Sequence, residues 1–161
     1  MPVIYIKEVA PDVKLGLWKM DDDILQILSE SSDMRKLFDT EISQYRSDSR
    51  RNEKLAVYSL LWKMTNSKIR ISHNDNGKPI VDGYNISISH TRGFASVILS
   101  KSKNVAVDIE YYSDRVGRIA DKFIRKDEIA KDVGSQLINR SAKETVYKYF
   151  SEQDLQYFDM K

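Results

Sequence analysis

The apolar residues of this chain change their spacing near Ser67, and this change constrains the fold more than any other feature. Before it, over residues 50–64, they recur at helical spacing. The helical stripe consists of Leu55, Tyr58, Leu61 and Trp62. After it, short strand-like runs separated by turn residues predict strands at 69–72, 84–89, 95–100 and 104–110. Together these patterns predict a mostly antiparallel sheet packed with helices, which is the α+β class.

Strand-like alternation also marks the start of the chain, over residues 3–7 and 14–20, with Pro11 and Asp12 forming the turn of a hairpin. The acids at 21–23 precede an apolar helical face. They predict a helix that ends near Glu30, because acidic side chains favour the positive end of the helix dipole. Toward the C-terminus, the spacing predicts helices at 115–123, 126–130 and 136–150 and a last strand at 154–158.

The composition is that of an ordinary globular domain spanning residues 1–161, with 41% apolar and 31% charged residues. Lys and Arg number 26 and Asp and Glu 24, so no overall field favours nucleic acid or a membrane surface as a partner. The absence of cysteine excludes disulfides and thiolate zinc sites and fits a reducing cytoplasm. No apolar run approaches the roughly 18 residues of a membrane span, and the N-terminal run is too short for a signal peptide. We therefore expect a cytoplasmic protein.

Two carboxylates lie inside the predicted strand at 104–110. Asp108 and Glu110 are two residues apart, so both leave the sheet on the same side. They repel each other unless a cation or basic groups neutralise them. Glu144 and Lys148 share one helix face and, taken alone, form an exposed pair worth about 0.3 kcal/mol. Together, three carboxylates supply the oxygen ligands that Mg²⁺ takes, and nearby lysines suit phosphate oxygens.

Two turn regions offer further polar groups. Gly77 and Pro79 form a turn that presents Lys78 outward, although a turn lysine by itself is ordinary surface. Ser89 and His90 end a predicted strand at a loop mouth, where binding groups often gather. A lone histidine at a strand end is more often structural. His73 lies in a polar turn and is interpreted as surface.

Four segments, read in order, resemble the ordered motifs of the 4′-phosphopantetheinyl transferase superfamily. They are Gly77-Lys78-Pro79, Ser87-Ile88-Ser89-His90, Val105-Ala106-Val107-Asp108-Ile109-Glu110 and Ser141-Ala142-Lys143-Glu144-Thr145-Val146-Tyr147-Lys148. The resemblance spans about residues 50–150 and is greater to the larger, pseudo-duplicated branch than to the short trimeric carrier-protein synthases. It implies two pseudo-equivalent halves, about 1–102 and 103–161. The second half is expected to be incomplete, because the family usually continues through further strands.

The resemblance implies a role for each acid and base of the last two motifs. Asp108, Glu110 and Glu144 match the magnesium-binding acids of the family. Lys143 and Lys148 match basic residues on one helix, with Lys148 expected near the pyrophosphate of coenzyme A. Glu144, Lys148 and Asp108 are therefore the expected catalytic residues.

The earlier motifs match the coenzyme A-binding positions of the family. Lys78, Ser89 and His90 are the matching residues, and the imidazole is expected at the 3′-phosphate. Lys54, together with Arg50 and Arg51, lies where the family places further phosphate-binding basic residues.

Two positions depart from the family pattern. Ala106 stands where the family prefers glycine, which adds a methyl group where a strand backbone approaches its neighbour. Arg140 replaces the aromatic residue that opens the last motif and packs its helix onto the sheet. The loss of this aromatic contact is expected to loosen the packing of the helix that carries Glu144.

The resemblance predicts a Mg²⁺-dependent enzyme that transfers the 4′-phosphopantetheine group from coenzyme A to a serine of an acyl or peptidyl carrier protein. An acidic helix of that partner is expected to approach a basic rim consisting of Arg115, Arg118, Arg125 and Lys126. The sequence leaves a monomer and a homo-oligomer both open.

Two hypotheses from other functional classes remain alternatives to the transferase. The first is a degenerate or truncated coenzyme A or carrier-protein binding module without turnover, favoured by Arg140 and the short C-terminus, since a site that lacks a wall can bind reactants without aligning them. The second is a binder of single-stranded nucleic acid that uses the 9 tyrosines and the Arg50-Arg51 pair. The near-neutral charge argues against it.

Overall fold

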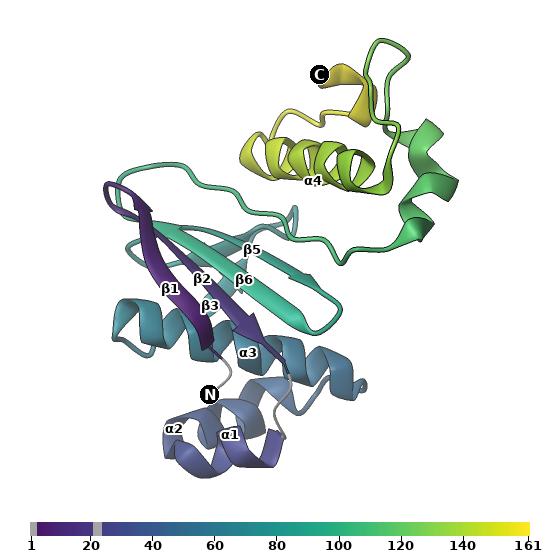
Figure 1. Cartoon of the computed structure of the whole chain (residues 1–161). Coiled ribbons are helices and arrows are strands. Elements are labelled where there is room, and N and C mark those ends of the chain that lie inside the picture. Colours follow the sequence, from purple (N-terminus) through teal and green to yellow (C-terminus); the bar gives the residue numbers. More distant parts are fainter. Residues whose placement is uncertain (1–2, 21–23) are drawn as a thin grey trace.

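The structure is a computed structural model that describes residues 3–20 and 24–161 (Figure 1). The N-terminal part consists of β1 (Val3–Ala10), β2 (Val13–Lys19), α1 (Ile24–Glu30), α2 (Ser32–Leu37), a π-helical turn η1 (Phe38–Ile42) and α3 (Asp48–Thr65). Four strands follow: β3 (Ile71–His73), β4 (Pro79–Val81), β5 (Asn85–Thr91) and β6 (Phe94–Ser100). The C-terminal part contains the 3₁₀ helix η2 (Asp114–Lys122), α4 (Val133–Tyr149) and the short 3₁₀ helix η3 (Tyr157–Asp159). The predicted helix start at 21–23 lies outside the described residues.

The main sheet has the strand order β1-β2-β6-β5, and every neighbouring pair is antiparallel. Strands β3 and β4 form a separate antiparallel pair. Asp12 closes the β1–β2 hairpin with a positive φ of 61°, and its carboxylate accepts hydrogen bonds from Ser100, the last residue of β6, and from Ser102 just after it. The predicted α+β class and the mostly antiparallel sheet are therefore confirmed.

Helix α3 is the central element of the N-terminal part, because it is buried on two sides. One side packs on the sheet through Ala56, Val57, Leu60, Leu61 and Met64. The other side packs on α1, α2 and η1 through Leu55 and Tyr58. Figure 1 shows α3 between the sheet and these short helices. The predicted stripe is thus buried, but its residues are divided between two apolar faces: Leu61 packs on the sheet, and Leu55 and Tyr58 pack on the short helices.

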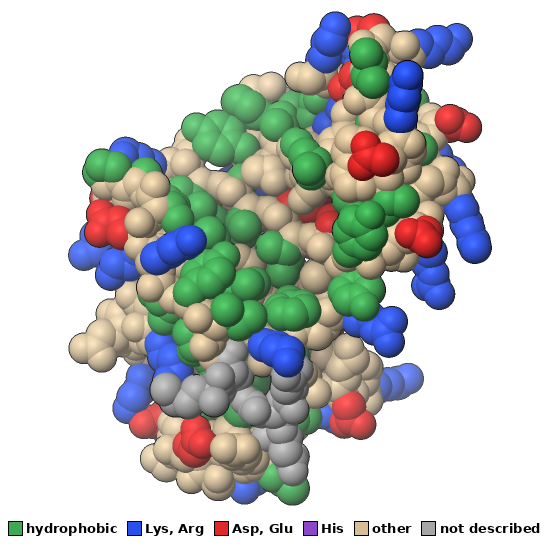
Figure 2. Space-filling model, in the orientation of Figure 1, with side chains coloured by type: hydrophobic (Ala, Val, Ile, Leu, Met, Phe, Trp, Pro, Cys, Tyr) green, Lys and Arg blue, Asp and Glu red, His purple; other side chains and the backbone are tan. Residues whose placement is uncertain are grey.

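The opposite face of the sheet is less covered. Leu15 and Leu17 alternate with Gly16, which faces α3, and Ile98 pairs with Leu15, so these three apolar side chains lie on the far face. All three are half-buried. Figure 2 shows apolar side chains gathered over the strands. In Figure 1, helix α4 lies beyond this far face.

Gly16 allows α3 to approach the sheet closely. A Cβ atom at this position would lie 2.7 Å from Leu60 Cδ1 and 2.8 Å from Met64 Sδ, both too short for real contacts. We expect Gly16→Ala to lower the free energy of unfolding by about 1–3 kcal/mol, as overpacking of a core does. Urea denaturation followed by circular dichroism measures this loss. Gly117→Ala is the matched control and should be nearly neutral, because its added methyl meets only Gln136 Oε1, at 3.5 Å.

The C-terminal part has a small core of its own, consisting of the buried residues Val116, Phe123 and Leu137. Helix α4 begins with a capping box, in which Asp132 accepts from the Ser135 backbone N–H and Ser135 accepts from that of Asp132. The predicted helix at 136–150 is confirmed.

Three predicted elements of the C-terminal part are different in the structure. Residues 115–123 are helical but form a 3₁₀ helix. Residues 126–130 are not a helix, because Glu128 folds back on Arg125 through both its backbone and its carboxylate and makes a turn. The predicted strand at 154–158 is wrong, since Asp154 has a positive φ of 48° and the chain then enters η3.

The predicted strand at 104–110 is not a strand either. The backbone N–H groups of Val107, Ile109 and Tyr111 donate to the hydroxyls of Ser87, Ser89 and Thr91 on β5. Side-chain oxygens therefore replace the carbonyl oxygens of a β-ladder, and the segment lies beside β5 without joining the sheet. This arrangement fixes the position of the acids in the segment.

Three elements had no counterpart in the sequence prediction: the helices α2 and η1 and the short strand β4. Helices α2 and η1 follow Ser31, whose hydroxyl accepts from Met34 N as an N-cap.

Among the described residues, no helix is both long enough and apolar enough to cross a membrane.

Candidate functional site

Asp108 is the centre of a polar cluster between β5 and α4. Its Oδ1 accepts from Ser89 Oγ at 3.1 Å and from Lys148 Nζ at 2.7 Å. Its Oδ2 accepts from Ser141 Oγ at 2.8 Å. Lys148 also donates to the carbonyl oxygen of Val107, at 2.9 Å. One carboxylate thus joins three segments that are far apart in the sequence, and its side chain is only 9% exposed.

Glu110 lies next along the same segment and is held by Arg140 of α4. Arg140 Nη1 is 2.6 Å from Glu110 Oε1, and both side chains are partly buried. Burial raises the pKa of Glu110 above its ordinary value of 4.5; Arg140 opposes this rise, and the negative charges of Asp108 and Glu144 add to it. The three acids therefore act on one another electrostatically, and the basic residues offset only part of their charge.

Glu144 has a different partner. The hydroxyl of Tyr157, from η3, donates to Glu144 Oε1. Burial raises the pKa of Tyr157, and the hydrogen bond to the Glu144 carboxylate raises it further. Because each of the three acids is held by its own partner, they do not form one cluster here. Among residues 3–20 and 24–161, no group of three or more His, Cys, Asp or Glu side chains is placed to hold a metal ion.

The chemistry of the three acids nevertheless fits a hard cation. They supply carboxylate oxygens, which are the ligands that Mg²⁺ prefers. Lys148 and Arg140 are cations on long side chains that neutralise Asp108 and Glu110, and each is about one third exposed. A divalent cation could replace these basic groups at the carboxylates.

A pocket of about 520 Å³ adjoins the cluster. It lies between the turn that carries Lys78, strand β5 and the C-terminal end of α4, where Tyr147 and Lys148 line it. The turn has a positive φ of 77° at Gly77, and Asn74 Oδ1 accepts from the backbone N–H of Lys78, at 2.8 Å. The structure therefore brings Lys78 and Lys148 to one cavity.

A second pocket, of about 460 Å³, lies on the other side of the same turn. Its basic lining groups are Arg50, Lys54, His73 and His90. Burial lowers the pKa of Lys54, and the positive charge of Arg50 lowers it further. Gly77, Pro79 and Ile88 line both pockets, so the two cavities are neighbours.

His90 is tied to α3 inside this second pocket. Its Nε2 is 3.4 Å from Arg50 Nη1, and its Nδ1 is 3.6 Å from Glu53 Oε1. Arg50 in turn pairs with Glu53, at 3.0 Å. The strand-end histidine and the first turns of α3 thus form one charged cluster. His73 is exposed, as the sequence predicts. The partial burial of its ring and the positive charges of Lys54 and Arg50 lower its pKa.

Lys143 does not join the candidate site. Its ammonium group donates to the carbonyl oxygen of Phe123 at 2.7 Å and to Glu128 Oε2 at 2.6 Å. Both members of this ion pair are at most 8% exposed. Lys143 therefore points into the C-terminal core, whereas Ser141 of the same helix reaches Asp108, and the role of Lys143 at coenzyme A stays a prediction.

Some members of the site carried no assigned role in the sequence. Ser141 lies three residues before Glu144, so its place on the same helix face could have been read from the spacing. Tyr157 had no sequence signal, because it reaches Glu144 only through the turn after α4. Glu53 could have been found as the helix neighbour of Arg50.

Comparison with known proteins adds no assignment. No protein-family model matches the chain, and no curated protein matches it significantly.

Proposed function

We propose that this chain transfers the 4′-phosphopantetheine group from coenzyme A to a serine of an acyl or peptidyl carrier protein. One observation carries the proposal: Asp108 binds Ser89 and Lys148 directly, so residues of three separate motif-like segments meet at one carboxylate. The two neighbouring pockets support it, because both contain basic groups that suit a phosphate-rich substrate. The protein would then be a phosphopantetheinyl transferase of the larger branch.

The two pockets divide the substrate between them. Lys54 and His90 suit the 3′-phosphate side of coenzyme A, because they line the 460 Å³ pocket with Arg50. Lys78 and Lys148 line the 520 Å³ pocket and suit the pyrophosphate and the pantetheine arm. Ser89 on β5 donates to Asp108 and so fixes that carboxylate. Lys148 would stabilise the charge that develops on the departing adenosine 3′,5′-bisphosphate.

The reaction itself consists of the transfer at phosphorus and the movement of one proton. The serine oxygen of the carrier protein attacks the phosphorus that bears the pantetheine arm, and the bond from that phosphorus to the adenosine bisphosphate breaks. Glu144, or a water held by it, takes the serine proton. Asp108, Glu110 and Glu144 would hold Mg²⁺, which when bound supplies positive charge for the pyrophosphate oxygens.

Intact-mass analysis tests the proposal. An apo acyl carrier protein is incubated with the chain, coenzyme A and Mg²⁺, with an EDTA control and a carrier protein whose acceptor serine is changed to alanine. The expected result is a gain of one phosphopantetheine group that requires both the metal and the serine. No gain with folded protein, for acyl and peptidyl carrier proteins alike, would refute transfer.

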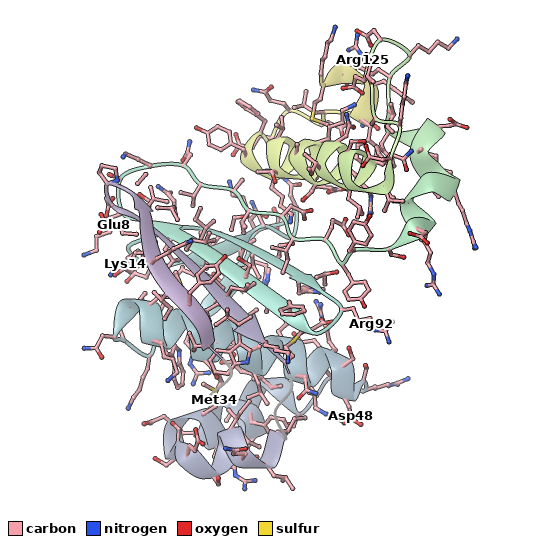
Figure 3. All side chains as sticks on the ribbon, in the orientation of Figure 1. Glu8, Lys14, Met34, Asp48, Arg92 and Arg125 are labelled. Atoms are coloured by element: carbon pink, nitrogen blue, oxygen red, sulfur yellow. The ribbon has the colours of Figure 1, made fainter. Side chains whose placement is uncertain are left out.

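The basic rim expected to meet the carrier protein is only partly available. Arg125 pairs with Asp127 at 2.9 Å and donates to the Phe158 carbonyl oxygen, so its charge is already offset. Figure 3 shows Arg125 in the part of the molecule far from the sheet. Arg115 is exposed and lines a pocket together with Glu110 and Arg140. Arg115 and Arg118 on η2 are therefore the better candidates for contact with an acidic helix.

A second candidate function, binding without turnover, has one specific observation in its favour. Arg140 holds Glu110 in an ion pair through its guanidinium group, at 2.6 Å. A guanidinium in this place competes with a metal ion for the carboxylate. In that case the chain would bind coenzyme A or a carrier protein, and calorimetry would show binding while the mass assay shows no transfer.

Arg140→Gln tests whether the guanidinium competes with a metal ion for Glu110. Removal of the guanidinium frees Glu110, and we expect the Mg²⁺ concentration that half-saturates coenzyme A binding to fall about fivefold, the effect of one partly exposed ion pair. Isothermal titration calorimetry with coenzyme A at several Mg²⁺ concentrations measures it. Arg35→Gln, on the exposed face of α2, is the matched control. An unchanged Mg²⁺ dependence would mean that Glu110 is not a metal ligand.

A further inference from the structure

A cavity of about 440 Å³ lies away from the candidate site, against the C-terminal half of α3. Its walls come from β2, α1, α2 and α3, through residues that include Trp18, Ile27, Met34, Ser59 and Trp62. The pocket that contains Lys54 and His90 is lined instead by the N-terminal half of α3. The volume of the cavity is within the range of small-molecule pockets.

The Ser59 hydroxyl is the first sign of a ligand. Ser59 is 6% exposed, and its Oγ has no hydrogen-bond partner in the part of the chain that the structure describes. A hydroxyl in a helix normally bonds the carbonyl oxygen four residues earlier or faces water. Thr65 of the same helix does so, with Leu61 O at 2.8 Å. Ser59 therefore keeps a donor and an acceptor unused beside an open cavity, which is costly unless something pairs with it.

The aromatic walls are the second sign. Trp18 is 3% exposed and Met34, which is labelled in Figure 3, is 4% exposed, yet both line the cavity. The Trp62 indole N–H donates to the carbonyl oxygen of Ile69 at 2.9 Å, which fixes the ring in place. Tyr58 packs edge-on against Trp62, with ring centroids 6.2 Å apart. Fixed indoles and a deformable thioether suit a flat apolar ring.

The charges at the mouth do not favour either sign. Glu30, Lys63 and Lys68 line it together. Lys68 already pairs with Asp33 at 2.5 Å, and Glu30 accepts from Gln26 at 3.3 Å. Two of these three charged groups have partners of their own, and both signs are present, so the mouth gives a charged ligand no net advantage over a neutral one.

We propose that this cavity binds a small neutral aromatic molecule that carries one hydroxyl or carbonyl group. The ring packs against the indoles of Trp18 and Trp62, and the polar group forms a hydrogen bond with Ser59 Oγ. This site is independent of the proposed transferase function, because it shares no residue with the cluster around Asp108.

The chain offers a direct probe of this site, because it contains 2 tryptophans and both line the cavity. The indole N–H signals of Trp18 and Trp62 in ¹⁵N-correlated NMR spectra are followed during titration with benzyl alcohol and, separately, with toluene. Both ligands carry the same ring, and only the first carries a hydroxyl. We expect saturable shifts of both signals and about fivefold tighter binding of benzyl alcohol, the effect of one hydrogen bond.

Ser59→Ala tests the role of the hydroxyl. The variant should still bind toluene as the wild type does, while the fivefold preference for benzyl alcohol falls to about one. Ser29→Ala, which removes an exposed hydroxyl of α1, is the matched control and should keep the preference. Asp108→Asn should also keep it, which separates a failure here from a failure of the proposed function. No saturable shift of either indole, or a preference that survives in Ser59→Ala, would overturn the proposal.

Discussion

Asp108→Asn is expected to lower the rate of phosphopantetheine transfer by about 10²–10³-fold while leaving the fold intact. The asparagine side chain keeps an oxygen that can accept from Ser89 or Ser141, so the local packing is retained. It loses the negative charge that pairs with Lys148 and that would help to hold a cation. A loss of this size is typical when one preorganised electrostatic group is removed from an active site.

The measurement is the initial rate of mass gain on an apo carrier protein at saturating coenzyme A and Mg²⁺. Asp121→Asn, an exposed acid of η2, is the control for a change of net charge by one unit. Circular dichroism shows whether each variant is folded. If Asp108→Asn transferred the group at the wild-type rate, the cluster around Asp108 would not be the active site. If the chain binds without turnover, the same variant should weaken Mg²⁺-dependent coenzyme A binding.

Lys143→Met is expected to cause the largest loss of stability, about 3–5 kcal/mol. The variant leaves the Glu128 carboxylate buried without its cation, and an unpaired buried charge is far more costly than a missing ion pair. The double variant Lys143→Met/Glu128→Gln should recover most of the loss. The amide oxygen that Glu128→Gln introduces still accepts from the backbone N–H of Arg125, which donates to Glu128 at 2.8 Å in the wild type. No uncompensated charge then remains.

Urea denaturation at neutral pH measures both variants, with Lys131→Met as the control for an exposed lysine in the same part of the chain. A loss below about 0.5 kcal/mol in Lys143→Met, the size expected of a surface change, would show that the pair does not hold α4 in place. It would also reopen the question of whether Lys143 faces coenzyme A.

The same ion pair predicts how stability depends on pH. Burial alone would raise the pKa of Glu128, but the hydrogen bonds from Lys143 and from the Arg125 backbone hold it below its ordinary value of 4.5. Below pH 4.5 the unfolded chain therefore takes up a proton that the folded chain does not. The stabilisation is fully present above pH 4.5 and is lost as the pH falls through the folded pKa. Part of this acid dependence should disappear in the double variant.

The sequence predicted the elements whose buried positions recur at a regular spacing. Helix α3, helix α4 and strands β5 and β6 follow from this apolar spacing, although α3 is buried on two sides. The segment at 104–110 misled the prediction for the same reason. It has the alternation of a strand, but the hydroxyls of Ser87, Ser89 and Thr91 occupy its backbone N–H groups, and an apolar pattern does not report hydrogen-bond partners.

The candidate site shows the same division between what local spacing predicts and what the packing of elements decides. The sequence alone determined which acids share a side, since Asp108 and Glu110 are two apart in an extended segment and Glu144 and Lys148 four apart on a helix. Only the tertiary structure decided which ammonium group reaches an acid: Lys148 turns to Asp108, whereas Lys143 is buried against Glu128. The physical reason is that local spacing fixes the direction of a side chain from its own element, while its partner depends on which element packs against that face.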